Sequence, residues 1–290
     1  MISQETVWEE IWPVVESLLD ATLAEDEVRV TSLLAPGGEA ARLYDLFGVT
    51  VFDILLKSVL GRTQLAITRA VQTEEGRYVH IEYVWPDPET ENGAYTAADL
   101  VTVQLQRTGD RWQVLAVNPA AVDFPLTEAR ARGVLVTGEA RNEGGELPRE
   151  PWILPVAFLA GSLQLTLREE ALADDVERLL LPGLQARHYG PISQIAGRRL
   201  WRDFREVATP LLDDPAAWAA SAEFILSEQS LREATQAAVG KQYQVPLTQM
   251  LPRIRRIKEA LAIQGLDERY SALGSKQIIL KEHDDANTSQ

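Results

Sequence analysis

Hydrophobic positions along the chain follow two different periods, and the change falls near Gly61. Before it, apolar residues recur three or four positions apart, as on one face of a helix, and turn residues separate the runs. After it, apolar and polar residues alternate, which is typical of half-buried strands. Ser3 or Thr6 is expected to cap the first helix, and Pro13 to kink or restart it. The pattern predicts helices over 7–23, 27–34, 39–47 and 50–60, then strands over 64–73, 77–85, 97–106 and 111–118.

The second half of the chain shows only the helical period. The best-defined helix start is at Asp214, which offers an N-cap, with Pro215 at the first helical position. Prolines and glycines between the two patterns indicate a connector with one short ordered piece over 126–136. Helices are expected over 153–167, 170–181, 192–208, 215–227, 231–239, 247–262 and 267–273.

This order of elements predicts an α+β N-terminal domain, with helices packed on a curved antiparallel sheet, followed by an all-α C-terminal domain. A length of 290 residues suits two domains, each large enough to bury its own core. The expected boundaries are 1–122 for the first domain, 123–151 for the connector, 152–280 for the second domain and 281–290 for a flexible tail.

Charge and cysteine content narrow the function classes. The chain has 43 acidic and 28 basic residues, a net charge of −15, and no cysteine. It therefore has no thiolate nucleophile, Cys-ligated zinc or disulfide. Residues 1–125 carry 20 acidic and 8 basic side chains, a net of −12, whereas the remainder carries 23 and 20, a net of −3. We expect no general coating of nucleic acid, but a local basic surface on the second domain remains compatible with the sequence.

The sequence predicts a cytoplasmic protein without a membrane partner. The first residues lack the basic and apolar segments of a secretory signal. The longest apolar run, near 152–167, is shorter than the about 20 residues that a membrane span needs, and polar residues interrupt it. Phosphate-binding glycine loops and the usual serine- or zinc-hydrolase motifs are missing from the sequence, so no cofactor and no metal site are predicted.

The first domain resembles the nuclear-transport-factor-two-like superfamily, which includes cystatin-like, polyketide-cyclase-like and ketosteroid-isomerase-like members. The resemblance covers residues 1–122 and rests on helices that precede long strands, the last of which carries Arg111-Trp112-Gln113-Val114. It implies a cone whose concave sheet face and helices enclose a pocket or a dimer surface, without a single activity.

Strand alternation predicts which residues line that cone. The expected inner face is mostly apolar, and His80 falls on the opposite face. An enzyme of the cyclase or isomerase kind would need an inward acid, and Asp99 with Tyr83 and Asn118 is the candidate catalytic set. The alternative for Asp99 is a residue at the end of a strand. The pocket candidates are Tyr83, Trp85, Asp99, Trp112 and Asn118.

Residues 230–262 resemble a helix-turn-helix domain. Val239, Gly240, Val245 and Met250 stand at suitable core and small-residue positions, and Pro246 suits the start of the second helix. The sequence departs from the usual pattern in two ways. Gln244 stands where the turn usually has glycine and would need a positive φ, and Pro252 lies inside the second helix. The alternative is an ordinary helix pair with a solvated basic face.

Local charge makes this segment a DNA-binding candidate. Residues 230–258 contain six basic residues and one acidic residue, a net of +5. A second basic stretch carries Trp201 and Phe204 at helical spacing, and these aromatics are expected in the core rather than on nucleic-acid bases. The candidate contacts are Lys241, Arg253, Arg255, Arg256 and Lys258.

Three functions fit these observations. The first is a non-enzymatic binding or regulatory protein, whose N-terminal domain binds a ligand or forms a homodimer and whose C-terminal basic helix contacts DNA. The second is a protein–protein assembly or chaperone-like factor that docks a protein partner on its acidic N-terminal domain. The third is the isomerase- or cyclase-like enzyme using Asp99. The sequence favours a role without catalysis.

Overall fold

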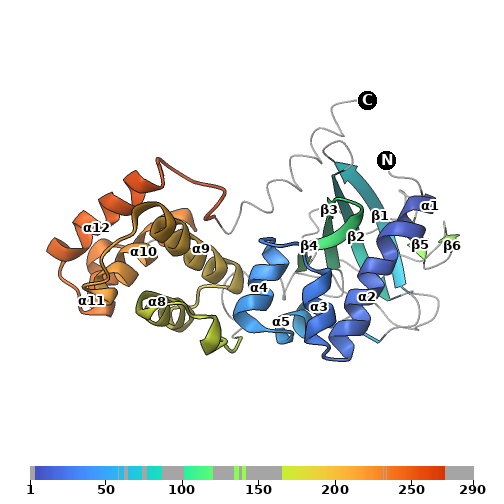
Figure 1. The fold of residues 1–290 in the computed structure, drawn as a ribbon, viewed down its shortest axis with the longest axis horizontal. Helices are drawn as coiled ribbons and strands as arrows, with labels where there is room; N and C mark the ends of the chain where they lie inside the picture. The colour runs from blue at the N-terminus through green and yellow to red at the C-terminus, as the bar shows by residue number, and fades with distance from the viewer. Residues whose placement is uncertain are drawn as a thin grey trace. The chain divides into compact units, whose positions relative to one another are not determined.

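The structure is a computed structural model, which describes residues 4–57, 59–61, 65–73, 77–86, 101–119, 134–136, 139–141, 165–230, 232 and 234–271. The chain divides into two compact units, Met1–Val156 and Ala157–Gln290. The described elements of the first are helices and an antiparallel sheet, and those of the second are helices (Figure 1). The described residues therefore form helices with an antiparallel sheet in the first unit and helices in the second, as predicted.

The first unit begins with a helix that changes its pitch. Gln4–Thr6 (α1) leads into a π-helical segment, Val7–Ile11 (η1), and then into Trp12–Leu23 (α2). Pro13 lies in the first turn of α2, but the backbone stays helical through Ile11 and Trp12, so the pitch changes next to the proline without a break in the helix. Thr6 makes no capping hydrogen bond. The next helices are Glu27–Leu33 (α3), Glu39–Phe47 (α4) and Thr50–Leu55 (α5), the last shorter than predicted.

The sheet has the strand order β4-β3-β2-β1-β5-β6, and paired strands run antiparallel. β5 and β6 lie in the stretch predicted as connector, and β5 pairs with β1, so the sheet extends into that stretch. The strands are Leu65–Thr73 (β1), Tyr78–Pro86 (β2), Val101–Thr108 (β3), Arg111–Pro119 (β4), Val134–Val136 (β5) and Glu139–Arg141 (β6).

Two irregularities break the strict alternation that the sequence predicts. In β4 the pairing moves from Leu105↔Val114 to Gln104↔Ala116, which leaves Leu115 as an extra residue. Beyond this bulge Asn118 stands opposite Thr102, whereas Val117 stands opposite Val103. The prediction that Asn118 shares a row with Trp112 and Val114 is therefore wrong, because one extra residue reverses the order of faces.

β2 has a similar shift against β3. Ile81 stands opposite Val103, but Val84 stands opposite Val101. Against β1, however, β2 pairs without a shift, from Thr73↔Tyr78 to Leu65↔Pro86. The row predicted for Tyr83 and Trp85 stays a prediction, because their side chains lie outside the described residues.

Helices α2, α4 and α5 pack against β4, next to the sheet (Figure 1). The segment after α3 joins the strand directly, because the Ala35 N–H donates to the Val114 carbonyl at 2.8 Å. A Cβ on Gly38 would lie 2.8 Å from the Leu115 carbonyl oxygen, so the bulge requires a glycine at this contact. Val79, Leu105 and Val114 are fully buried.

The described residues of the second unit form five α-helices after a short 3-10 turn, Glu169–Ala171 (η4). These are Asp175–Ala186 (α8), Pro191–Ala208 (α9), Pro215–Gln229 (α10), Gln236–Tyr243 (α11) and Leu247–Ala260 (α12). The predicted cap is confirmed, since Asp214 Oδ1 accepts the Ala217 N–H at 3.1 Å. The described residues of two predicted helices, 165–167 and 267–271, form no helix.

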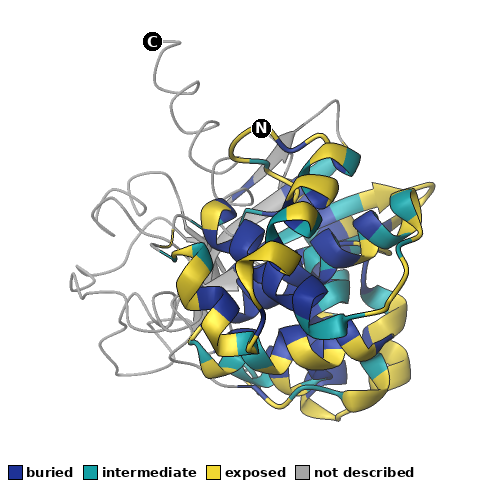
Figure 2. Ribbon diagram, turned by 90° about the vertical axis from the view of Figure 1, so that its left-hand side faces the viewer, coloured by how far each residue is buried: buried dark blue, intermediate teal, exposed yellow. Residues whose placement is uncertain are grey.

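Helix α10 lies at the centre of this unit and contacts α8, α9, α11 and α12. Its residues from Ala217 to Ser227 are all buried, and the other helices turn mixed faces outward (Figure 2). Trp201 and Phe204 of α9 are fully buried against Trp218, with ring centres 5.3–5.9 Å apart. The prediction that these aromatics belong to the core is confirmed.

Candidate nucleic-acid interface

A tight turn of three residues, 244–246, joins α11 to α12. Gln244 has φ 58° and ψ 35°, so the expected positive φ at this non-glycine position is confirmed. The Val245 N–H donates to the Gly240 carbonyl at 2.8 Å. A Cβ on Gly240 would lie 2.8 Å from the Val245 carbonyl oxygen, so the close approach of the two chain segments requires glycine here.

One face of α12 packs on the unit and the other is exposed. Val239, Val245 and Met250 are buried, as predicted for core positions. The Ser221 hydroxyl oxygen of α10 lies 2.7 Å from the Ala217 carbonyl oxygen of its own helix and 3.2 Å from the Met250 carbonyl oxygen, so α10 and α12 approach each other closely here. Pro252 lies within the helix without interrupting it. The exposed residues of α12 include Thr248, Gln249, Pro252, Arg255, Arg256 and Glu259.

Arg253 is engaged inside the unit. Its Nη2 lies 3.1 Å from Asp213 Oδ1, and its Nη1 donates to the Gln249 carbonyl at 2.9 Å. The hydrogen bond from Arg253 lowers the pKa of Asp213. Only 16% of the Arg253 side chain is exposed. These contacts remove Arg253 from the set of cations available to a ligand.

Two further basic residues of α12, Arg256 and Lys258, have weaker internal contacts. Lys258 Nζ lies 2.8 Å from Glu228 Oε2, in an ion pair with both side chains about one-third exposed. Such pairs contribute little stability, although Glu228 compensates the lysine charge. Arg256 is exposed, with its guanidinium 5.8 Å from the Trp218 ring centre and 3.5 Å from the Ala208 carbonyl oxygen.

Lys241 on α11 and Arg255 on α12 are exposed. Within the described part of the chain, neither side chain has a hydrogen bond or an ion pair. Together with Arg256 they are the cations that this helix pair offers to solvent. Of the five predicted contacts, three are therefore exposed cations. Lys258 is paired with Glu228, and Arg253 is paired with Asp213 and mostly buried.

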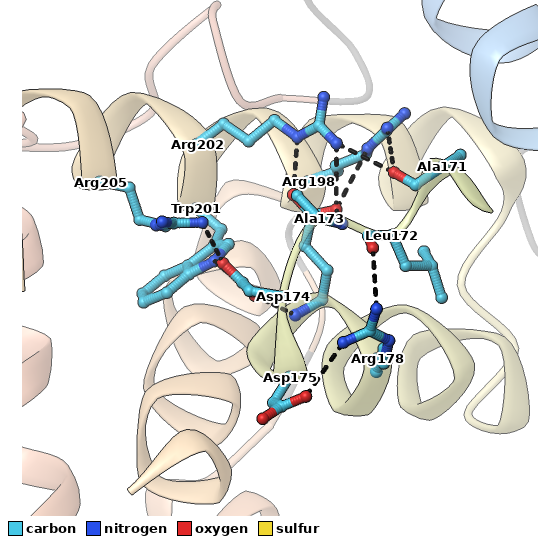
Figure 3. A network of polar contacts seen from close by, with 11 residues as sticks. Ala171, Leu172, Ala173, Asp174, Asp175, Arg178, Arg198, Trp201, Arg202 and Arg205 are labelled. Carbon is cyan, nitrogen blue, oxygen red and sulfur yellow. Dashed lines mark hydrogen bonds and ion pairs between the residues drawn. The ribbon is translucent and has the colours of Figure 1, made fainter. Parts of the chain in front are cut away.

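A polar network at the start of α8 uses the second basic stretch (Figure 3). Glu177 is fully buried and accepts a hydrogen bond from Arg202 Nε at 2.6 Å, with Arg198 Nε at 3.6 Å. Asp174 accepts from the Trp201 indole N–H at 3.0 Å and from Arg205 at 2.5 Å. These arginines have carboxylate partners within the unit, which explains their clustering without a nucleic-acid ligand.

An open pocket of about 340 Å³ adjoins this network. Because the charges of Arg202 and Arg205 are matched by Glu177 and Asp174, we assign no ligand to it. Its lining residues are Ala173, Arg202, Arg205, Glu206, Thr209 and Pro210.

Sequence reasoning missed a second buried ionic cluster. Arg187, at the end of α8, forms two hydrogen bonds with the carboxylate of Glu223, which is 1% exposed, and a third with the hydroxyl of Tyr243. A signal was present, since Glu223 is the only charged residue between Pro215 and Ser227 in an otherwise apolar helix. An isolated charge in such a helix indicates a buried partner.

The pocket predicted for the first domain lies largely outside the described residues. Asp99 is not described, nor are the side chains of Tyr83, Trp85 and Asn118. Trp112 is 8% exposed, and its indole N–H donates to Glu10 of η1 at 3.3 Å. This contact ties β4 to the first helical segment.

Among the described residues, no group of histidine and acidic side chains is arranged to hold a metal ion. Every described helix is too short or too polar to cross a membrane. Comparison of the chain with protein-family models, curated proteins and solved structures gave no match.

Proposed function

We propose that this is a two-unit binding protein whose C-terminal unit contacts double-stranded DNA through α11 and α12. The observation that carries the proposal is the turn at Gln244, which joins two short helices and leaves Lys241, Arg255 and Arg256 exposed. The exposed first turns of α12 carry Thr248 and Gln249 and no acidic residue. Hydroxyl and amide side chains suit base edges, and cations suit phosphates.

The acidic total of the chain does not oppose this proposal. The first acidic residue of α12 is Glu259, in its last turn. Arg253 and Lys258 are paired with carboxylates of the same unit, so we expect fewer than five phosphate contacts. The affinity for DNA would then fall less steeply with salt than five basic residues would predict.

The experiment is a salt titration of duplex binding, followed by fluorescence anisotropy. Three phosphate contacts predict a log–log slope of about −2.7, whereas use of all five basic candidates predicts about −4.5. Lys241→Gln, Arg255→Gln and Arg256→Gln should each weaken binding and reduce the slope by about 1.

Arg178→Gln is the matched control, because Arg178 is an exposed arginine of the same unit, paired with Asp175 on α8. It should leave both affinity and slope unchanged. Absence of duplex binding by the full chain at low salt, or equal losses in Arg178→Gln and Arg255→Gln, would contradict the proposal.

A second candidate function is protein assembly through the first unit, with a cone-like binding or dimerisation domain. It is favoured by the exposed α2–α3 corner, where Leu23 and Val28 are 62% and 83% exposed beside Glu25 and Glu27. Sedimentation velocity over a range of protein concentrations tests the homodimer. Val28→Glu should shift the population toward monomer, and a monomer at every concentration in the unmodified protein would rule out this form.

A further inference from the structure

The cluster of Arg187, Glu223 and Tyr243 joins three helices at one buried point. The Tyr243 hydroxyl donates to Glu223 Oε2 at 2.6 Å and accepts from Arg187 Nη2 at 2.6 Å. The Arg187 guanidinium also lies 4.8 Å from the Tyr243 ring centre. Burial, with the nearby Glu223 charge, raises the pKa of Tyr243, so its hydroxyl keeps its proton at neutral pH.

A glycine makes room for this arrangement. A Cβ on Gly183 of α8 would lie 2.5 Å from Arg187 Nη2 and 2.7 Å from the Tyr243 hydroxyl oxygen. No side chain is therefore tolerated at this position while both groups keep their places.

Tyr243 is the last residue of α11, immediately before the left-handed Gln244. The hydrogen bonds of its hydroxyl therefore act on the residue from which the turn to α12 departs. Four residues before α11 begins, Arg232 donates to the carbonyls of Arg187 and His188 at 3.1 and 3.0 Å. The chain is therefore joined to the connection between α8 and α9 both before α11 and at its last residue.

Apolar packing alone holds α11 weakly. Only Val239 and Gly240 of its eight residues are buried, and Gly240 has no side chain to contribute. A short helix with so little buried area depends on its polar anchors for a fixed orientation.

We propose that Tyr243, held by Arg187 and Glu223, is a positioning residue that controls how α11 and α12 present the DNA-binding surface. This inference rests on the proposed function. Without the anchor, α11 samples other orientations, and only a fraction of molecules is competent to bind. The apparent Kd then rises by the inverse of that fraction, while the contacts in the bound state stay the same.

The test compares Tyr243→Phe with Tyr189→Phe. Tyr189 is buried and Tyr243 is half-buried, but no hydrogen bond from the Tyr189 hydroxyl is found among the described residues. Tyr243→Phe should accelerate amide hydrogen exchange in 236–245 about fivefold to tenfold, the loss expected from one buried hydrogen bond. It should weaken duplex binding about threefold to tenfold at an unchanged salt slope. Tyr189→Phe should change neither quantity.

Equal exchange rates in the two variants would overturn the positioning role. Faster exchange at 236–245 in a protein that never binds duplex DNA would overturn the proposed function and leave the anchor established. If circular dichroism shows that Tyr243→Phe is unfolded, Arg187→Lys replaces it, because lysine keeps the charge but cannot form the paired contact with Glu223. Amide exchange at 236–245 and duplex affinity are then measured in Arg187→Lys, and the same faster exchange and weaker binding are expected.

Discussion

The guanidinium of Arg253 lies 5.1 Å from the centre of the Trp218 ring. Trp218 in turn donates its indole N–H to the Leu211 carbonyl at 3.0 Å, and Arg253 contacts Asp213 in the same loop. A residue that the sequence assigns to nucleic acid thus links α12 to the segment before α10. Its ion pair with Asp213 and the small exposed fraction of its side chain distinguish Arg253 from Arg255 and Arg256, which are exposed on the same helix.

Arg253→Gln should destabilise the second unit by about 1 kcal/mol, through loss of the cation–π contact and of the packed aliphatic stem. Arg255→Gln, at an exposed position on the same helix, should leave the unit almost unchanged. Urea unfolding followed by tryptophan fluorescence measures both. Equal stability of the two variants would show that Arg253 is not part of the packing.

Glu177→Ala should be among the most damaging substitutions in the chain. It leaves Arg198, which is 5% exposed, without its carboxylate, and removes the partner of Arg202. Breaking one side of a buried ion pair costs about 3 to 5 kcal/mol. The control Glu170→Ala removes an exposed carboxylate that is paired with Arg168. A melting temperature that falls equally in both would contradict the buried network.

Gly240→Ala should destabilise the α11–α12 pair by about 1 to 3 kcal/mol, because the added methyl group meets the Val245 backbone, which cannot move aside freely. Gly265→Ala is the matched change in the same unit, where a Cβ has no neighbour within 4 Å. Chemical denaturation should show a loss only for Gly240→Ala. A comparable loss at Gly265 would indicate a general effect of removing glycine.

Gln244→Gly should stabilise the protein. The left-handed backbone costs a non-glycine residue about 1 to 2 kcal/mol, and the extra freedom of glycine in the unfolded chain takes back part of that gain. The expected net gain is up to about 1 kcal/mol. Gln242→Gly, two residues earlier and inside α11, should have the opposite sign, since glycine weakens a helix interior. Loss of stability in both variants would contradict the strain at Gln244.

Alkaline pH should unfold the second unit. Burial, with the charge of Glu223, raises the pKa of Tyr189 from 10.0 to about 12, and the pKa of Tyr243 also rises. A raised pKa in the folded state means full stability below pH 10 and progressive loss as the pH rises toward the folded value. Absorbance at the tyrosinate band and circular dichroism should change together between about pH 10 and 12. Complete ionisation with intact helicity would contradict the burial of these hydroxyls.

The departures from the predicted strand rows have a local cause. Val114, Leu115, Ala116 and Val117 are four consecutive apolar residues, so their types do not show at which position the extra residue stands. The bulge follows from pairing with β3 and from the approach of Gly38 to the Leu115 carbonyl, a contact between distant parts of the chain. Asn118 was therefore placed with Trp112 by a rule that holds only for uninterrupted pairing.

The sequence by itself determined the longer helices and the four long strands, because periodicity and capping act over a few residues. The helix start at Asp214 and the positive φ of Gln244 both follow from chemistry within one turn. Tertiary structure decided which charges remain available. Arg253 and Asp213 are 40 residues apart, and Arg187 and Glu223 are 36 apart. Such pairs form only when packing brings their helices together, so a count of basic residues in the sequence cannot reveal which of them solvent or a ligand can reach.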